Sequence, residues 1–349
     1  MAGRVRVLVV DDSAYMRVIL KDILEADPGI IVAGVAKNGL EAVEKTKALS
    51  PDVVTLDIQM PKMDGVATLQ RIMKECPTRV LMLSAMDRKD DQLPLKAIKM
   101  GAVDFISKPG GPVSVEIMKF KEKIVEIVKV AAMAKLDVLK RAPAPPPARL
   151  RMHRKPSDGP RAVVIGASTG GPRALESLFA ALPKDLPAPM FVVQHLPPEF
   201  AKTFARRLCA AGGPVVEVAT DGLRPERGRA YLAPGGRHLV VSRTGSRNYL
   251  MRLEDREPVR FVKPSADVLF SSVAQAYGSR VLGVVMTGMG ADGASGARQI
   301  KFAGGTVVVQ DEHSSVIFGM AKAVVDAGAA DKVVPLDAIA GEIVRFLED

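Results

Sequence analysis

Several residue types that would point to a particular function are scarce in this sequence. The chain of 349 residues has no tryptophan, its aromatic residues make up 4% of the total, and it has two cysteines and four histidines. So few aromatic side chains leave few platforms on which single-stranded bases could stack. No metal-type spacing joins Cys76 and Cys209, and we expect both to be reduced, packed thiols in a cytosolic protein.

The sequence also lacks a long uninterrupted hydrophobic run. Its start, MAGRVRVLVVDD, passes directly from a short basic segment into a strand-like run, and charged residues interrupt each later apolar stretch before it could span a membrane. We therefore expect no signal peptide, no direct membrane insertion and a cytoplasmic location.

Positive charge is what the composition has in excess. The formal net charge is +10 and the pI is about 9.6, values that would suit a nucleic acid, a membrane surface or an acidic protein partner. The contents of 48% hydrophobic and 25% charged residues are those of a globular protein. A length of 349 residues favours two domains, each with its own core.

The first 140 residues alternate apolar runs with amphipathic segments. We predict strands at 6–10, 30–36, 53–58, 79–85 and 102–107, and helices at 13–26, 40–49, 66–76, before Met100 and at 115–140. This alternation is typical of a parallel sheet with helices on both faces. Residues 1–140 are therefore predicted to form a doubly wound, flavodoxin-like α/β domain.

A proline-rich segment separates this domain from a second α/β pattern. Residues 141–160, RAPAPPPARLRMHRKPSDGP, show no periodicity and predict an extended basic linker. From 161 to 349 we predict a mainly parallel α/β domain, with helices that include 172–181, 199–211 and 266–277. Short strands between 229 and 253, around a Pro-Gly-Gly turn at 234–236, predict an antiparallel hairpin insertion.

Polar residues follow the predicted strands of the first domain. Asp11 and Asp12 follow the first strand, Asp57 the third, Ser84 the fourth and Lys108 the fifth. These residues should converge, because the carboxyl ends of parallel strands meet at one edge of a sheet. We predict that the three aspartates hold Mg²⁺, that Asp57 is the phosphorylated nucleophile, and that Ser84 and Lys108 contact phosphoryl oxygens. Any one of these acids could instead cap a helix, but the whole set favours phosphoryl transfer.

A glycine-rich segment, GASTGG at 166–171, lies between a predicted strand and a helix of the second domain. Dinucleotide binding would need an acid near the end of the next strand, but that strand ends in Gln194 and His195. The segment also satisfies the G-x-S-x-G pattern of a nucleophilic serine. Since His195 and Asp292 also follow strands, we predict a Ser168, His195 and Asp292 triad that needs no cofactor.

Each member of this predicted triad has an ordinary structural alternative. Ser168 and Asp292 could simply cap the helices that follow them, and a single histidine is more often structural than catalytic. By the same reasoning, His238 and His313 are expected to be structural and His153 to be an inert linker residue. The catalytic hypothesis therefore depends on the three residues together.

Longer motifs around these residues resemble two known families. VVDDS, DIQMPKMDG around Asp57 and SKP at 107–109 resemble two-component receivers over residues 4–126. GASTGG, QHLPPEF, APGGRHL, KPSADVLF and TGMGADG resemble the catalytic domain of chemotaxis protein-glutamate methylesterases from about residue 162 onward. The resemblance assigns Ser168, His195 and Asp292 to the family's triad and gives Thr169 and Met289 supporting roles in shaping the site.

The resemblance also implies partners and a reaction. A histidine kinase would phosphorylate the receiver, and the second domain would hydrolyse glutamate γ-methyl esters, and often deamidate particular glutamines, on methyl-accepting chemotaxis receptors. A receiver with a nucleic-acid-binding output is the competing class, but the second half lacks a helix-turn-helix signature and a basic recognition helix. The intact motifs do not support an inactive scaffold. We therefore expect no nucleic-acid partner, and an esterase that the unphosphorylated receiver inhibits.

Overall fold

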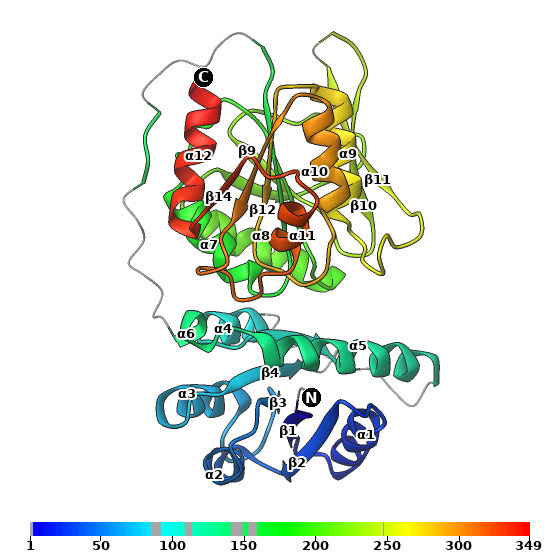
Figure 1. The fold of residues 1–349 in the computed structure, drawn as a ribbon, viewed down its shortest axis with the longest axis vertical. Coiled ribbons are helices and arrows are strands. Elements are labelled where there is room, and N and C mark those ends of the chain that lie inside the picture. The colour runs from blue at the N-terminus through cyan, green and yellow to red at the C-terminus, as the bar shows by residue number, and fades with distance from the viewer. Residues whose placement is uncertain (1–2, 85–91, 109–113, 141–148, 153–158, 247) are drawn as a thin grey trace. The chain divides into compact units, whose positions relative to one another are not determined.

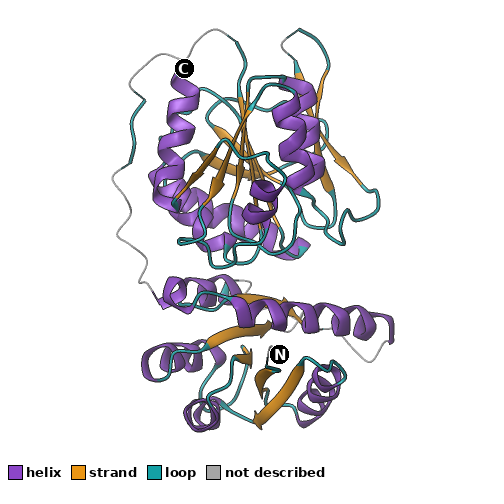
Figure 2. Cartoon of the chain, viewed as in Figure 1, coloured by secondary structure: helices purple, strands orange, loops and turns teal. Residues whose placement is uncertain are grey.

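A computed structural model describes residues 3–84, 92–108, 114–140, 149–152, 159–246 and 248–349. The chain divides into two compact units, Met1–Ala142 and Pro143–Asp349, and in each unit helices flank a central sheet (Figure 2). Most of the linker predicted at 141–160 lies outside the described residues. Within its described part, the Leu150 N–H donates to the Ala181 carbonyl of the second unit at 3.0 Å.

The first unit contains a five-stranded parallel sheet in the order β2-β1-β3-β4-β5. Its strands are β1 (Val5–Val10), β2 (Ile30–Ala36), β3 (Val53–Asp57), β4 (Arg79–Ser84) and β5 (Asp104–Ser107). Its helices are α1 (Ala14–Glu25), α2 (Gly39–Leu49), α3 (Gly65–Glu75), α4 (Leu93–Lys99), α5 (Ser114–Met133) and α6 (Leu136–Lys140). Helices α2 to α4 pack against one another on one face, and α1 packs with α5 on the other (Figure 1).

The prediction of a single long helix at 115–140 is wrong, because the helix is interrupted between α5 and α6. An unbroken α-helix would bond the Val138 N–H to the Ala134 carbonyl. That carbonyl instead accepts a hydrogen bond from Arg79 Nε at 2.7 Å, and the Val138 N–H donates to the Lys135 carbonyl at 3.1 Å. A side chain from β4 thus takes the acceptor that a continuing helix would need.

The second unit contains a seven-stranded parallel sheet in the order β14-β13-β12-β6-β7-β9-β8. Its strands are β6 (Ala162–Ala167), β7 (Met190–Gln194), β8 (Val215–Val218), β9 (Arg229–Leu232), β12 (Val281–Val285), β13 (Thr306–Gln310) and β14 (Lys332–Val334). Its helices are α7 (Gly171–Ala181), the 3₁₀ helix η1 (Pro198–Phe200), α8 (Ala201–Ala210), α9 (Ala266–Tyr277), α10 (Ala294–Phe302), α11 (Met320–Asp326) and α12 (Leu336–Glu348). Helices α7, α8 and α12 pack on one face and α9 to α11 on the other (Figure 1).

The predicted hairpin is present but lies later in the chain than expected. Strands β10 (His238–Arg243) and β11 (Tyr249–Glu254) pair antiparallel as a separate two-stranded sheet. The strand at 229–232 instead joins the main sheet, parallel to β7 and β8, so the Pro-Gly-Gly turn leads from the main sheet into the hairpin. A side chain at Gly235 would lie 2.6 Å from the Leu196 carbonyl, so this turn packs closely on the loop after β7.

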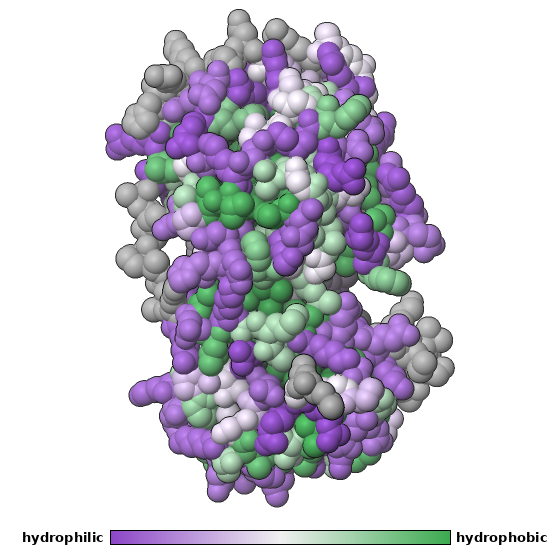
Figure 3. All heavy atoms as spheres, in the orientation of Figure 1, coloured by the Kyte–Doolittle hydropathy of each residue, from purple (hydrophilic) through white to green (hydrophobic). Residues whose placement is uncertain are grey.

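Two smaller expectations also differ from the structure. Helix α11 was not predicted, because seven residues are too few to show a clear helical period. Cys209 is exposed on α8 rather than packed, while Cys76 is partly buried, and both thiols are free. On the face drawn in Figure 3, hydrophilic side chains predominate and hydrophobic ones lie between them. Within the described ranges, no helix is both long and apolar enough to cross a bilayer.

Both sheets reverse their strand order near the middle. In the first unit the reversal lies between β1 and β3, and in the second it lies between β6 and β12. The connections that follow such a strand pair leave toward opposite faces of the sheet and open a crevice at the carboxyl ends of the strands. The residues directly after these strands therefore surround the two crevices.

Candidate active site

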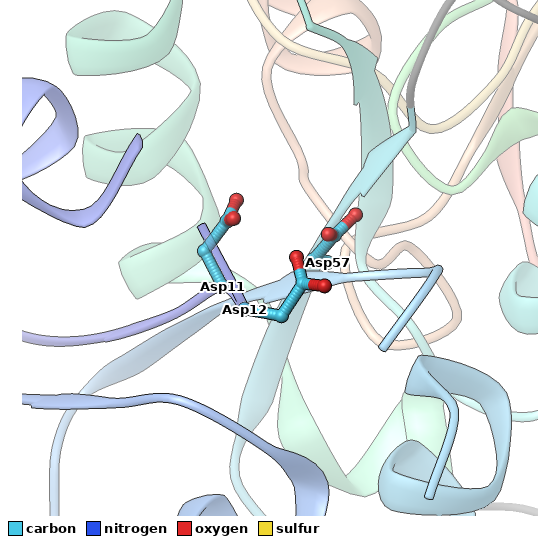
Figure 4. Close-up of side chains that lie close together, drawn as sticks. All are labelled: Asp11, Asp12 and Asp57. Carbon is cyan, nitrogen blue, oxygen red and sulfur yellow. The ribbon is translucent and has the colours of Figure 1, made fainter. Parts of the chain in front are cut away.

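Three carboxylates meet at the crevice of the first unit (Figure 4). Asp11 and Asp12 follow β1 and Asp57 ends β3, and each offers an oxygen that lies within 4.8 Å of the others. Asp11 and Asp57 are buried, whereas Asp12 is exposed. A cluster of acidic oxygens open to solvent on one side has the ligand chemistry that Mg²⁺ prefers.

Lys108 partly neutralises this cluster. Its Nζ atom lies 2.7 Å from Asp11 Oδ2 and 2.8 Å from Asp57 Oδ2. Burial raises the pKa of the Asp57 carboxyl to about 6, even though the Lys108 ammonium acts to lower it. Ser84 ends β4 at the same edge of the sheet, and its carbonyl accepts the Lys108 N–H at 2.7 Å. The structure thus places all five predicted receiver residues around one crevice.

The crevice of the second unit contains the residues predicted as a triad. Ser168 follows β6, and its backbone is held by Ser168 N–H to the Thr287 carbonyl at 3.0 Å and by Gly171 N–H to the Ser168 carbonyl at 2.7 Å. His195 follows β7, and its Nδ1 lies 3.1 Å from Ser168 Oγ. On the other side of the ring, Nε2 lies 2.9 Å from Asp292 Oδ2. The three side chains thus form one hydrogen-bonded line.

The surroundings of Asp292 determine which nitrogen of His195 carries the proton. Burial, the largest single influence, raises the pKa of Asp292, but hydrogen bonds from His195, Ser265 and the Asp267 backbone together with the His195 charge hold it below its ordinary value. An ionised carboxylate only accepts hydrogen bonds, so His195 Nε2 is the donor. In the neutral form of the ring, the lone pair of Nδ1 therefore faces the Ser168 hydroxyl.

Asp292 also accepts hydrogen bonds from the first turn of α9. Ser265 Oγ donates to Oδ1 at 2.6 Å, the Ala266 N–H to Oδ2 at 2.6 Å, and the Asp267 N–H to Oδ1 at 3.0 Å. These three donors and His195 fill the acceptor capacity of the carboxylate and fix its plane. A buried anion at the amino end of a helix is also stabilised by the helix dipole.

The two residues expected to shape the site lie in the loops after β6 and β12, which meet at Ser168. Thr169 is buried, and its carbonyl lies 3.0 Å from Thr287 Oγ1. Met289 is half-buried in the loop that follows β12. In that loop, a side chain at Gly288 would lie 2.8 Å from Ser168 Cβ, so only a glycine allows the loop to lie this close to the serine.

Comparison with known proteins agrees with the two-unit architecture. Residues 163–343 match the family model of the CheB methylesterase, and residues 7–118 match that of the response regulator receiver domain. The chain belongs to the CheB methylesterase family. Relatives of the same organisation include a protein-glutamate methylesterase/protein-glutamine glutaminase from Archaeoglobus fulgidus, 46% identical with 98% of each chain covered, and one from Pyrococcus abyssi, 42% identical with 99% of this chain and 94% of that protein covered.

A solved structure supports the same assignment for the second unit. The Thermotoga maritima CheB methylesterase catalytic domain is 39% identical, with a TM-score of 0.52, and the match covers 54% of this chain and 99% of that domain. CheB proteins act on chemotaxis receptors and are regulated by a kinase, and phosphorylation of receiver domains in general depends on Mg²⁺.

Sequence reasoning missed several residues of this CheB site. Ser265 and Asp267 lie in the KPSADVLF motif, where the family resemblance was the only available signal. His238 was expected to be structural, and it is fully buried, with Nδ1 accepting the Ser265 N–H at 3.2 Å and Nε2 3.1 Å from the Glu257 carbonyl. Burial lowers the pKa of His238, which favours the neutral ring that this pairing needs. The strand-end pattern indicates His195 and gives no role to Gln194, the residue before it.

Proposed function

We propose that this chain is a phosphorylation-activated serine hydrolase that demethylates glutamate γ-methyl esters on methyl-accepting chemotaxis receptors. The observation that carries the proposal is the line from Ser168 through His195 to Asp292, at 3.1 Å and 2.9 Å. Ser168 is the nucleophile, His195 the general base and acid, and Asp292 the group that orients the ring and stabilises its charged form.

The acylation step follows from this assignment. His195 Nδ1 takes the Ser168 hydroxyl proton while Oγ attacks the ester carbon, and the carbonyl electron pair moves to oxygen. Backbone N–H groups beside the serine stabilise that oxyanion. As the intermediate collapses, the bond to the methoxy group breaks, and the proton from His195 leaves with it as methanol. The glutamyl group is then bound to Ser168 as an ester.

Deacylation repeats the chemistry with water. His195 takes a proton from water, the hydroxide attacks the acyl carbon, and Ser168 leaves with the proton returned by His195. The product is the free glutamate carboxylate. A glutamine carboxamide would react through the same acyl-enzyme with ammonia as the leaving group, so we propose that the same three residues also deamidate particular glutamines.

In the first unit we propose that Asp57 accepts a phosphoryl group from a chemotaxis histidine kinase. Asp11, Asp12 and Asp57 would hold Mg²⁺, which when bound neutralises negative charge at the phosphoryl group. An Asp57 oxygen attacks phosphorus, and the bond from phosphorus to the kinase histidine breaks. Lys108, already 2.8 Å from Asp57, would pair with a phosphoryl oxygen, and Ser84 would donate its hydroxyl to another.

The decisive test is demethylation of a methyl-labelled chemotaxis receptor. Ser168→Ala should lose on the order of a thousandfold or more in turnover, because members of a triad act as a unit. Ser177→Ala is the matched control, since this α7 serine is exposed and its hydroxyl donates to the Arg173 carbonyl of its own helix at 3.2 Å. A folded Ser168→Ala protein that releases methanol as fast as the Ser177→Ala control would refute the assignment of the nucleophile.

A further inference from the structure

The glutamine that ends β7 makes an unusual pair of contacts in the second unit. Gln194 is 3% exposed, and its Nε2 group donates to the Ser168 carbonyl at 3.0 Å and to the His195 carbonyl at 3.3 Å. One side-chain amide therefore binds the backbone of the proposed nucleophile and of the proposed base. The mechanism described above assigns no role to this amide.

The orientation of the amide is determined by these two acceptors. If the oxygen and nitrogen of the side chain were exchanged, an acceptor would face two carbonyl oxygens. In the observed orientation, Gln194 Oε1 is buried and has no hydrogen-bond partner among the described residues. Leaving a buried acceptor unsatisfied is costly to folding. An apolar side chain would avoid that cost but could not bind the two carbonyls.

The neighbouring backbone leaves space for this arrangement. A side chain at Gly171 would lie 2.0 Å from Gln194 Oε1, so only glycine allows the amide to lie against the first turn of α7. The Gly171 N–H donates to the same Ser168 carbonyl at 2.7 Å. Two donors from different elements therefore hold this one carbonyl.

The carbonyl of Ser168 and the N–H of Thr169 belong to the same peptide group. In a trans peptide these two groups point in opposite directions, so a carbonyl held toward Gln194 directs the Thr169 N–H away from it. In strand-turn-helix sites that expose a nucleophilic serine, the N–H of the next residue is a usual donor to the oxyanion. The next carbonyl, that of Thr169, is held in turn by the Thr287 hydroxyl at 3.0 Å.

We infer that Gln194 is a positioning residue for the esterase reaction. By holding the Ser168 and His195 carbonyls with one amide, it sets the distance between nucleophile and base and aligns the peptide that offers its N–H to the oxyanion. The inference rests on the proposed role of Ser168. Gln194 acts through the backbone of these two residues, whose carbonyls its amide binds.

The test replaces the amide with a side chain of similar length that cannot donate. In the full chain, Gln194→Met should lower kcat for receptor demethylation by about tenfold to a hundredfold, the scale of a small misplacement of reacting groups. KM should change by less than about threefold, because the substrate contacts remain. Ser272→Ala is the control, since this buried hydroxyl also joins two backbone groups, accepting from the Val241 N–H at 3.1 Å and donating to the Leu269 carbonyl at 2.8 Å.

A second measurement separates positioning from general loosening of the fold. An alkylboronic acid forms a tetrahedral adduct with a nucleophilic serine, so its affinity reports stabilisation of the tetrahedral state. The affinity of Gln194→Met for this probe should fall by a factor similar to the fall in kcat, while Ser272→Ala should retain both. The pH at which kcat/KM is half-maximal should not move, because His195 and Asp292 keep their partners.

Two results would overturn the inference. One is a Gln194→Met kcat within threefold of the wild type, and the other is a fall in kcat with unchanged boronic acid affinity. Neither bears on the proposed function as long as Ser168→Ala is inactive. If Ser168→Ala instead retains activity, the assignment of the nucleophile fails first, and with it the basis of the Gln194 inference.

Discussion

Asp292 caps helix α9, which has Asp267 in its first turn, and Asp267 caps helix α10, which begins just after Asp292. The Asp292 carboxylate, just before α10, accepts the Ala266 and Asp267 N–H groups at the start of α9. The Asp267 carboxylate, in the first turn of α9, accepts the Gly293 and Gly296 N–H groups at the start of α10, at 2.9 Å and 2.8 Å. This exchange satisfies backbone donors that a helix leaves unpaired and joins the aspartate of the proposed triad to two helices.

The first prediction concerns the stability of this exchange. Asp267→Ala should be less stable than Asp267→Asn by about 1 kcal/mol, because asparagine keeps the oxygen that accepts both N–H groups and alanine does not. Chemical unfolding of the two variants at neutral pH measures the difference. Equal stability would show that the Asp267 oxygen contributes nothing as a cap.

The pH dependence of the stability of Asp267→Asn, relative to the wild type, follows from the burial of the Asp267 carboxyl. Burial raises the pKa of Asp267 above its ordinary value of 3.8, so the folded protein binds this proton more tightly than the unfolded chain does. The contribution of the Asp267 carboxyl to the free energy of unfolding is therefore lost as pH rises from its pKa in the unfolded chain through its pKa in the folded protein. Asp267→Asn lacks that loss, so its stability relative to wild type should improve as pH rises above about 4.

The second prediction concerns the Ser265 hydroxyl. Its hydrogen bond, at 2.6 Å, helps to lower the pKa of Asp292. Without that hydrogen bond the carboxylate becomes more basic and retains its proton to higher pH. The acidic limb of the kcat/KM profile should therefore move to higher pH in Ser265→Ala and stay in place in Ser265→Thr, which keeps a hydroxyl. A shift to lower pH, or the same shift in both variants, would contradict this account.

The third prediction concerns the metal site of the receiver. Because the pKa of Asp57 is about 6, a proton and Mg²⁺ compete for its carboxylate near that pH. The affinity for Mg²⁺ should therefore fall as pH falls through about 6, since only the ionised carboxylate is a good ligand. Calorimetric titration is suitable because the chain has no tryptophan to report binding. Asp22→Asn, an exposed α1 acid, should titrate as the wild type does.

The fourth prediction is that Asp57 is the only site of Mg²⁺-dependent phosphorylation. Incubation with a small phosphodonor should label the wild type and Asp22→Ala equally, and Asp57→Ala should remain unlabelled. The label should be acid-labile. If Asp57→Ala is labelled to the same occupancy as the wild type, another residue is the phosphoryl acceptor.

The fifth prediction concerns regulation. If the unphosphorylated receiver inhibits the esterase, a fragment from Pro160 to Asp349 should hydrolyse receptor esters faster than the unphosphorylated full chain and should not respond to phosphodonor. Full-length Asp57→Ala should remain slow with phosphodonor present. A tenfold change requires only about 1.4 kcal/mol of coupling. A fragment no faster than its parent, at equal folded fraction, would exclude inhibition of this kind.

Local pattern in the sequence determined much of this architecture. Alternating apolar and amphipathic segments predict the parallel sheets, because a strand and a helix differ in the period at which they bury side chains. Asp57 and Ser168 could be chosen as candidates because each follows a buried strand, and the ends of parallel strands meet in a crevice. The helical period of the apolar residues also predicted one helix over 115–140. No local sequence pattern shows that Arg79 binds the Ala134 carbonyl and interrupts that helix.

Tertiary structure decided what no local pattern contains. The choice of His195 Nδ1 to face Ser168 depends on where Asp292 lies across the ring, 97 residues later in the chain. The three other donors to Asp292 come from Ser265 and the start of α9, 25 to 27 residues before it. Gln194 reaches back 26 residues to the Ser168 carbonyl. Such contacts form only when separate elements pack together. The candidate triad could therefore be chosen from sequence, while its orientation, its ionisation and the supporting residues Ser265, Asp267 and Gln194 follow from packing.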